Sequence, residues 1–149
     1  MGYLTPRQKF IWDLKGKGLQ EASIARKLDV ARQTVHKALD IANSKVYIAL
    51  EESAKLNKID VKTIDPTRGV LIGYSPEFKT DVVVTFSAGN GIQIWYRQEG
   101  DCENCDRLQV CREMLLAEAK DRDIQLPESA GSILPSKLTE ALFLKITGE

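Results

Sequence analysis

Hydrophobic residues in the first part of the chain recur at the spacing of a helix. Thr5 and Gln8 have the spacing of a capping box, and Pro6 between them suits a first helical turn. The pattern predicts a helix from residue 6 that ends at Gly16 to Gly18. It predicts a second, short helix over residues 20–28, and a third that begins near residue 31 after a brief turn.

The third helix poses a question about its length, because no glycine or proline occurs between residues 34 and 58. We expect a bend at Asn43-Ser44, where the serine can cap a fourth helix. That helix would carry an apolar stripe formed by Val46, Ala49, Leu50 and Leu56. Such a stripe packs either on its own domain or against a second copy of the chain.

After Lys58 the period changes from that of a helix to that of strands. β-branched and aromatic runs at residues 59–64, 70–74, 80–86 and 92–98 are separated by turn residues, which predicts an antiparallel sheet of three or four strands. In the last hairpin, alternation places one apolar set on a single face of the sheet. The set is Val82, Val84, Phe86, Ile92, Ile94 and Tyr96.

Two further helices are predicted after the sheet, at about residues 106–122 and from Ser136 to Ile146. The expected fold class is therefore α+β. Residues 1–58 would form a helical domain of the helix-turn-helix type. Residues 59–149 would form a domain that senses a signal or dimerises, with a small antiparallel sheet followed by two C-terminal helices.

The net charge is zero, but the charges are unevenly distributed. Residues 1–58 hold eleven Lys and Arg against six Asp and Glu, and residues 59–149 hold ten against fifteen. A basic first half favours a polyanionic partner, although a solvated charged surface is the competing interpretation. The sequence has no apolar run long enough for a membrane span and no signal-peptide pattern at its start, so we expect a cytoplasmic protein with no membrane partner.

The order helix, short turn, helix is the geometry that inserts an exposed helix into the major groove of DNA. The residues that carry this pattern are Leu4-Thr5-Pro6-Arg7-Gln8, Leu14, Gly18-Leu19, Ile24-Ala25, Leu28, Val30, Thr34-Val35 and Leu39. Over residues 3–56 the chain resembles the domain shared by LuxR-type regulators and region 4 of sigma factors, most of all archaeal Tfx-type regulators. The resemblance implies DNA binding and a small α+β C-terminal domain. The chain departs from the family at Gln20 and Ala31, where Ser or Thr is common at the helix starts.

Side-chain chemistry on the third helix suggests which residues would read DNA. Arg can pair bidentately with guanine and Gln with adenine, while Lys and His suit a phosphate or a base edge. The candidate readers are therefore Arg32, Gln33, His36 and Lys37. The candidate backbone contacts are Thr34, Arg26, Lys27 and Arg7, which would set register and salt dependence.

These features lead to a first hypothesis, a homodimeric, sequence-specific transcriptional regulator that binds double-stranded DNA. The alternative is a protein-interaction adaptor whose helical domain docks on the transcription machinery without DNA specificity of its own. An enzyme is not expected, because the only histidine, His36, lies on the helix assigned to DNA and no glycine-rich phosphate loop follows a strand.

All three cysteines lie in the segment CENCDRLQVC, as Cys102, Cys105 and Cys111. Their spacing lets three thiolates reach one metal, either zinc or the iron of an iron-sulfur cluster. We favour zinc, because the cluster would need a remote fourth cysteine that this chain lacks. The fourth ligand would come from Asp101, Glu103, Asp106, the sheet or a second subunit. Other uses stay open: a reversible disulfide between the first two cysteines, or a buried apolar role for the third. A metal or redox sensor with DNA binding as its output is the third hypothesis.

Overall fold

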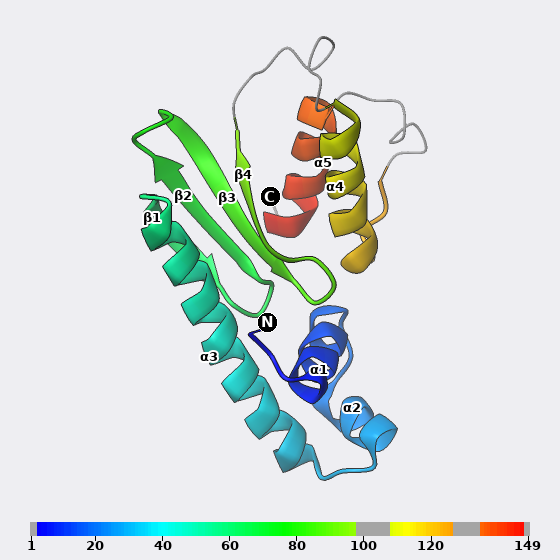
Figure 1. Cartoon of the computed structure of the whole chain (residues 1–149). Helices are drawn as coiled ribbons and strands as arrows, with labels where there is room; N and C mark the ends of the chain where they lie inside the picture. The colour runs from blue at the N-terminus through cyan, green and yellow to red at the C-terminus, as the bar shows by residue number, and fades with distance from the viewer. Residues whose placement is uncertain (1–2, 98–107, 127–134, 148–149) are drawn as a thin grey trace. The chain divides into compact units, whose positions relative to one another are not determined.

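The computed structural model describes residues 3–97, 108–126 and 135–147, and it divides into two compact units, residues 1–97 and 98–149. The first unit begins with three helices, α1 (Pro6–Gly16), α2 (Glu21–Leu28) and α3 (Arg32–Leu56). They are followed by strands β1 (Asp60–Asp65), β2 (Val70–Ser75), β3 (Thr80–Ser87) and β4 (Gly91–Tyr96) (Figure 1). The second unit contains α4 (Leu108–Asp121) and α5 (Pro135–Thr147). The α+β class is confirmed.

The start of α1 follows from the sequence as expected. The Thr5 side chain accepts a hydrogen bond from the backbone N–H of Gln8 at 3.2 Å, and the Gln8 side chain accepts one from the backbone N–H of Thr5 at 3.1 Å. Gln20 and Ala31 precede α2 and α3 and make no side-chain capping hydrogen bond. The first turn of α3 is therefore held by packing and not by a cap.

The three helices enclose a small core of their own. Ile11 of α1, Ile24 and Ala25 of α2, and Val35 and Leu39 of α3 are buried together. Asp29 ends α2 in the left-handed conformation, with φ 54°, and the Val30 N–H donates to the Ala25 carbonyl at 3.0 Å. Only Asp29, Val30 and Ala31 separate the two helices, as in a helix-turn-helix.

The predicted bend at Asn43-Ser44 is wrong, because α3 is one helix of 25 residues from Arg32 to Leu56. No proline or glycine interrupts it, and its buried stripe continues without a break through Val46, Ala49 and Leu50. Leu56, which we expected in that stripe, is 84% exposed.

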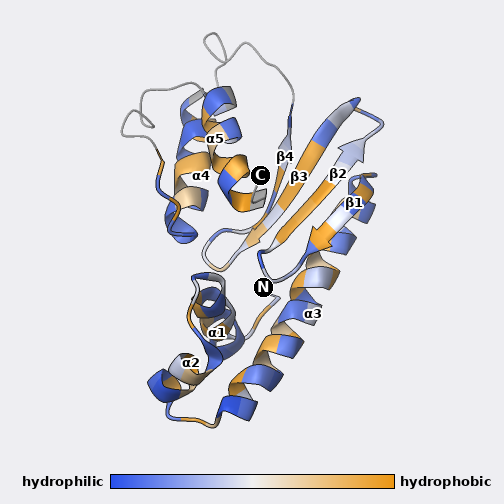
Figure 2. Cartoon of the chain, turned by 180° about the vertical axis from the view of Figure 1, so that it is seen from behind, coloured by the Kyte–Doolittle hydropathy of each residue, from blue (hydrophilic) through white to orange (hydrophobic). Residues whose placement is uncertain are grey.

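The buried stripe of α3 packs on the sheet of the same chain. Ala42, Val46, Leu50 and Ala54 share a core with residues of β2 and β3, namely Leu71, Val82, Val84 and Phe86. Figure 2 shows the apolar colouring of these two strands and the alternation of apolar and polar turns along α3. The stripe therefore has its partner within the chain and is not available to a second copy.

The sheet is a four-stranded antiparallel meander in the order β1-β2-β3-β4, within the predicted range of three or four strands. In the last hairpin Phe86 pairs with Ile92, Val84 with Ile94 and Val82 with Tyr96. The apolar residues of each strand therefore share one face, as the alternation predicted. These six side chains all contribute to the core beneath α3.

A close contact joins α1 to the turn between β1 and β2. Trp12 packs edge-on against Phe86 with ring centroids 5.3 Å apart, and its indole N–H donates to the Pro66 carbonyl at 3.1 Å. Gly69 lies directly against this pair with φ 67°, and a Cβ there would overlap the Phe86 carbonyl oxygen and come within 2.9 Å of the Trp12 ring. The compact unit consequently extends to residue 97, past the division expected at residue 58.

In the second unit, the two predicted helices are present as α4 and α5, and each bears a buried apolar face. Leu115 and Ala119 of α4 and Leu138, Leu142 and Ile146 of α5 are buried. α5 begins at Pro135, one residue before the predicted start at Ser136. Among the described residues, no helix is long and apolar enough to cross a membrane.

Candidate nucleic-acid interface

The four candidate readers lie in the first two turns of α3 with exposed side chains. Arg32, Gln33, His36 and Lys37 are all exposed, while Val35 between them is fully buried in the helical core. Arg32, Gln33 and His36 line one shallow hollow of about 340 Å³. The sequence therefore predicted correctly which residues at the start of α3 face away from the core.

The candidate backbone-contacting residues are exposed as well. Thr34 lies on α3, Arg26 and Lys27 lie in the last turn of α2, and Arg7 lies in the first turn of α1. Arg26 donates to the Ser23 hydroxyl at 3.2 Å, a contact at the surface of α2. Three basic groups from two helices and the Thr34 hydroxyl are thus free of the core, as phosphate contacts require.

The sequence interpretation missed the carboxylates beside these residues. Glu21, the first residue of α2, accepts a hydrogen bond from His36 Nδ1 at 3.1 Å and lies 3.8 Å from Arg32 Nε. Asp40 lies one turn further along α3, with 3.6 Å between its carboxylate and His36 Nε2. The i to i+4 spacing of His36 and Asp40 was a readable signal, whereas the contact with Glu21 requires the packing of α2 on α3.

These carboxylates change the acid–base behaviour of His36. The hydrogen bond and charge of Glu21, with the charge of Asp40, raise the pKa of His36 above its ordinary value of 6.5, and desolvation and the Arg32 guanidinium oppose the shift. Both ring nitrogens carry protons in the charged form, so each can face a carboxylate. The start of α3 is therefore an ion-paired cluster and not an uninterrupted positive surface.

A second hollow, of about 480 Å³, is also lined by His36. Its lining includes Lys15 of α1, Asp40 of α3 and Arg68 of the β1–β2 turn, together with Glu21 and the edge of Trp12. Mixed charges in this hollow surround His36 from α1, α2, α3 and the sheet.

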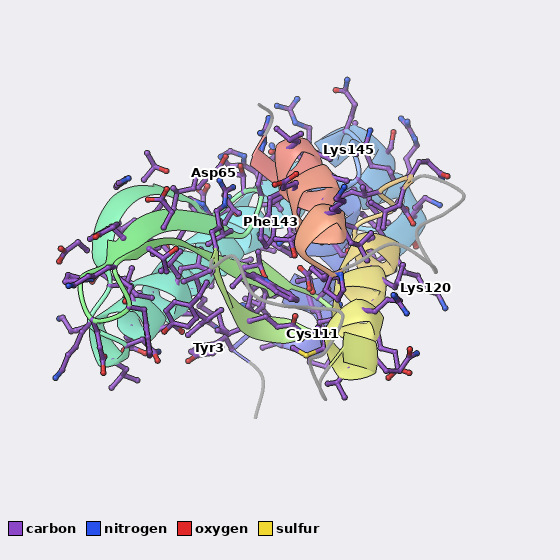
Figure 3. The ribbon with its side chains drawn as sticks, turned by 90° about the horizontal axis from the view of Figure 1, so that it is seen from above. Tyr3, Asp65, Cys111, Lys120, Phe143 and Lys145 are labelled. Atoms are coloured by element: carbon purple, nitrogen blue, oxygen red, sulfur yellow. The ribbon has the colours of Figure 1, made fainter. Side chains whose placement is uncertain are left out.

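The candidate metal residues fall largely outside the described ranges. Cys102 and Cys105 lie there, as do the proposed fourth ligands Asp101, Glu103 and Asp106. Cys111 is a free, half-buried thiol on α4 (Figure 3), four residues from the buried Leu115. Within the described parts of the chain, no group of three metal-binding side chains occurs. The zinc or iron-sulfur site stays a prediction.

No protein-family model matches the chain, and the searches of curated proteins and of solved structures found no match.

Proposed function

We propose that this protein is a sequence-specific DNA-binding transcriptional regulator that reads the major groove with the start of α3. The observation that carries the proposal is the pairing of α2 with α3 across three residues, with the buried face directed to a shared core and the reader residues exposed. In proteins of this geometry the second helix enters the groove and its N-terminal residues meet base edges. The likeness to LuxR-type and Tfx-type domains supports the same function.

The chemistry of the four reader side chains suits them to different contacts with DNA. Arg32 offers a bidentate pair to guanine and Gln33 to adenine. Lys37 and protonated His36 supply charge for phosphate oxygens or base acceptors. Arg7, Arg26 and Lys27 support the same binding through the DNA backbone and carry no sequence information.

Binding to DNA would require the ion pairs at this surface to rearrange. Arg32 must leave Glu21 to reach a base, so the cost of breaking an exposed ion pair is subtracted from the binding energy. That cost is small, on the order of 0.2–1 kcal/mol for a solvent-exposed pair. A good bidentate contact to guanine, worth about 1–3 kcal/mol of discrimination, exceeds it.

The second candidate function is a protein-interaction adaptor of the transcription machinery. Glu21 and Asp40 favour it, because carboxylates beside the readers repel phosphate and suit a basic protein surface. The two candidates make opposite predictions about salt-sensitive binding to duplex DNA.

The experiment is selection of binding sites from random duplex DNA with the full chain, followed by fluorescence anisotropy over a range of salt. We expect Arg32→Ala to lower affinity for the selected site by about tenfold or more and to relax preference at one base pair. Arg26→Ala should lower affinity evenly for all sequences and flatten the salt slope by about one unit. Lys62→Ala removes the same charge from the sheet and is the matched control, with no expected effect.

Equal affinity for all duplexes would refute sequence-specific recognition. The absence of salt-sensitive binding to any duplex would refute DNA binding and favour the adaptor.

A further inference from the structure

The face of α3 opposite the core carries apolar side chains that the chain itself leaves uncovered. Ile41, Tyr47 and Ile48 are 42%, 42% and 51% exposed. Ile41 and Ile48 are seven residues apart, which places them two turns apart on one side of the helix. A hollow of about 420 Å³, lined by Asn43, Ser44, Tyr47, Ile48 and Pro66, lies beside Ile48. We call the surface formed by Lys37, Ile41, Ser44, Ile48 and Glu52 the outer stripe.

We propose that the outer stripe is the surface by which two copies of this chain pair, with their α3 helices antiparallel. A two-fold axis between Ser44 and Lys45 would place Ile41 opposite the partner's Ile48, and Ile48 opposite the partner's Ile41. The same operation would place Lys37 opposite the partner's Glu52. The outer stripe is thereby complementary to its own copy in both apolar contacts and charge, as a two-fold symmetric interface requires.

Charge selects the antiparallel arrangement over the parallel one. On the outer stripe Lys37 lies in the N-terminal half of α3 and Glu52 in the C-terminal half. The other exposed charges of α3 are mixed, with Arg32 and Asp40 in the first half and Glu51 and Lys55 in the second. A parallel pair would set Lys37 against its own copy and Glu52 against its own copy, which is repulsive. Within the described residues neither Lys37 nor Glu52 has an ion-pair partner, so both are available.

In this dimer the distance between the two copies of Gln33 matches the spacing of successive major grooves, an argument that rests on the proposed function. Gln33 lies between eleven and twelve residues from the two-fold axis, so the two copies of Gln33 would be about 35 Å apart along the helix pair at 1.5 Å per residue. Successive major grooves on one side of a duplex are about 34 Å apart. Lys37 lies on the outer stripe, so in the dimer it would face the partner's Glu52 and would not contact DNA. The remaining reader face, formed by Gln33 and His36, is centred about a quarter turn of the helix away from the outer stripe. It would therefore point in the same direction in both copies, parallel to the two-fold axis.

The apolar contact is small, which makes the expected dimer a weak one, in the micromolar range or above. We would measure it by sedimentation equilibrium of the full chain, without DNA and under reducing conditions. Ile48→Glu should weaken the dimer by about 30-fold or more, because each two-fold interface would contain the charge twice. Val61→Glu is the matched control, because Val61 is similarly exposed but lies on β1, outside the outer stripe.

A charge reversal tests the register. Lys37→Glu should weaken the dimer, and adding Glu52→Lys should restore it, because the exchanged charges would face each other again across the two-fold axis. Unchanged thermal melting of each variant would show that the exposed substitutions do not disturb the fold. A monomer at every concentration, a dimer insensitive to Ile48→Glu, or a double variant that stays as weak as Lys37→Glu would overturn the proposal.

A DNA experiment separates this inference from the proposed function. Two selected half-sites one helical turn apart should bind two copies cooperatively, and insertion of about five base pairs should abolish the cooperativity by moving the second groove to the far side. A dimer in solution that binds no DNA would refute the proposed function and support the pairing surface. Sequence-specific binding by a chain that stays monomeric would refute the pairing surface and support the proposed function.

Discussion

Gly69 offers the sharpest test of how the helical segment is attached to the sheet. It lies in the β1–β2 turn with φ 67°, and Gly91, the first residue of β4, has nearly the same φ of 69°. A Cβ at Gly69 would overlap the Phe86 carbonyl oxygen and press on the Trp12 ring, whereas a Cβ at Gly91 would meet nothing within 4 Å. The two glycines share the same positive φ and differ in their surroundings.

The magnitude follows from that difference. A left-handed conformation costs an alanine about 1 kcal/mol relative to glycine, and this cost is common to Gly69→Ala and Gly91→Ala. The loss of unfolded-state entropy on replacing glycine, about 0.4–1 kcal/mol in the stabilising direction, is also common to both. Only Gly69→Ala adds the cost of overpacking, about 1–3 kcal/mol. We therefore expect it to be less stable than Gly91→Ala by about 2 kcal/mol.

The assay is urea unfolding followed by far-UV circular dichroism and tryptophan fluorescence, with thermal melting as a check. For a unit of this size, 1 kcal/mol corresponds to about 4–8 °C, so the two variants should melt on the order of 10 °C apart. Tryptophan emission should shift in the native state of Gly69→Ala, because the indole of Trp12 must move from the Pro66 carbonyl. Equal loss of stability in the two variants would refute the claim that the close packing of Trp12 on the turn requires glycine.

Three further predictions concern charge and metal. NMR titration should give His36 a pKa above 6.5, and this pKa should fall toward 6.5 in Glu21→Gln. Because the pKa of His36 is higher in the folded state than in the unfolded state, the interactions of protonated His36 stabilise the fold fully below pH 6.5. This stabilisation is lost as pH rises through the folded-state pKa. Glu118 is fully buried and its Oε1 lies 2.8 Å from Arg122 Nε, so Arg122→Met should lower the free energy of unfolding by about 3 kcal/mol, and added Glu118→Gln should recover part of it in urea unfolding. Elemental analysis and a visible spectrum of anaerobically purified protein should find zinc without colour, with a lower content in Cys105→Ser; a metal-free protein, or iron with a brown absorption, would contradict this prediction.

The elements of this fold were largely predictable because each depends on local sequence. The capping box of Thr5 and Gln8 fixed the start of α1, and the alternation in Val82, Val84 and Phe86 fixed the inner face of β3. The continuity of α3 was missed for a reason that is not local. Ser44 is a good cap in isolation, but burial of Val46 against the sheet favours an uninterrupted helix.

The residues of the candidate interface could be predicted from the sequence, but their ion pairs with neighbouring carboxylates could not. Exposure of Arg32, Gln33 and His36 follows from the helical period around the buried Val35. The carboxylate of Glu21 reaches His36 only because α2 packs on α3, fifteen residues apart in sequence. Tertiary packing of this kind leaves no periodic signal in one sequence.

The single helix from Arg32 to Leu56 serves two cores at once, with Val35 and Leu39 in the helical core and Val46 and Leu50 beneath the sheet. A chain cut after residue 58 would lack the sheet and would expose the apolar side of half of this helix. We therefore expect that residues 1–58 do not fold as an independent DNA-binding domain. α3 is about 37 Å long at 1.5 Å per residue. Because it is one continuous helix, a tilt of its sheet-packed end would also move Arg32 and Gln33 at its other end.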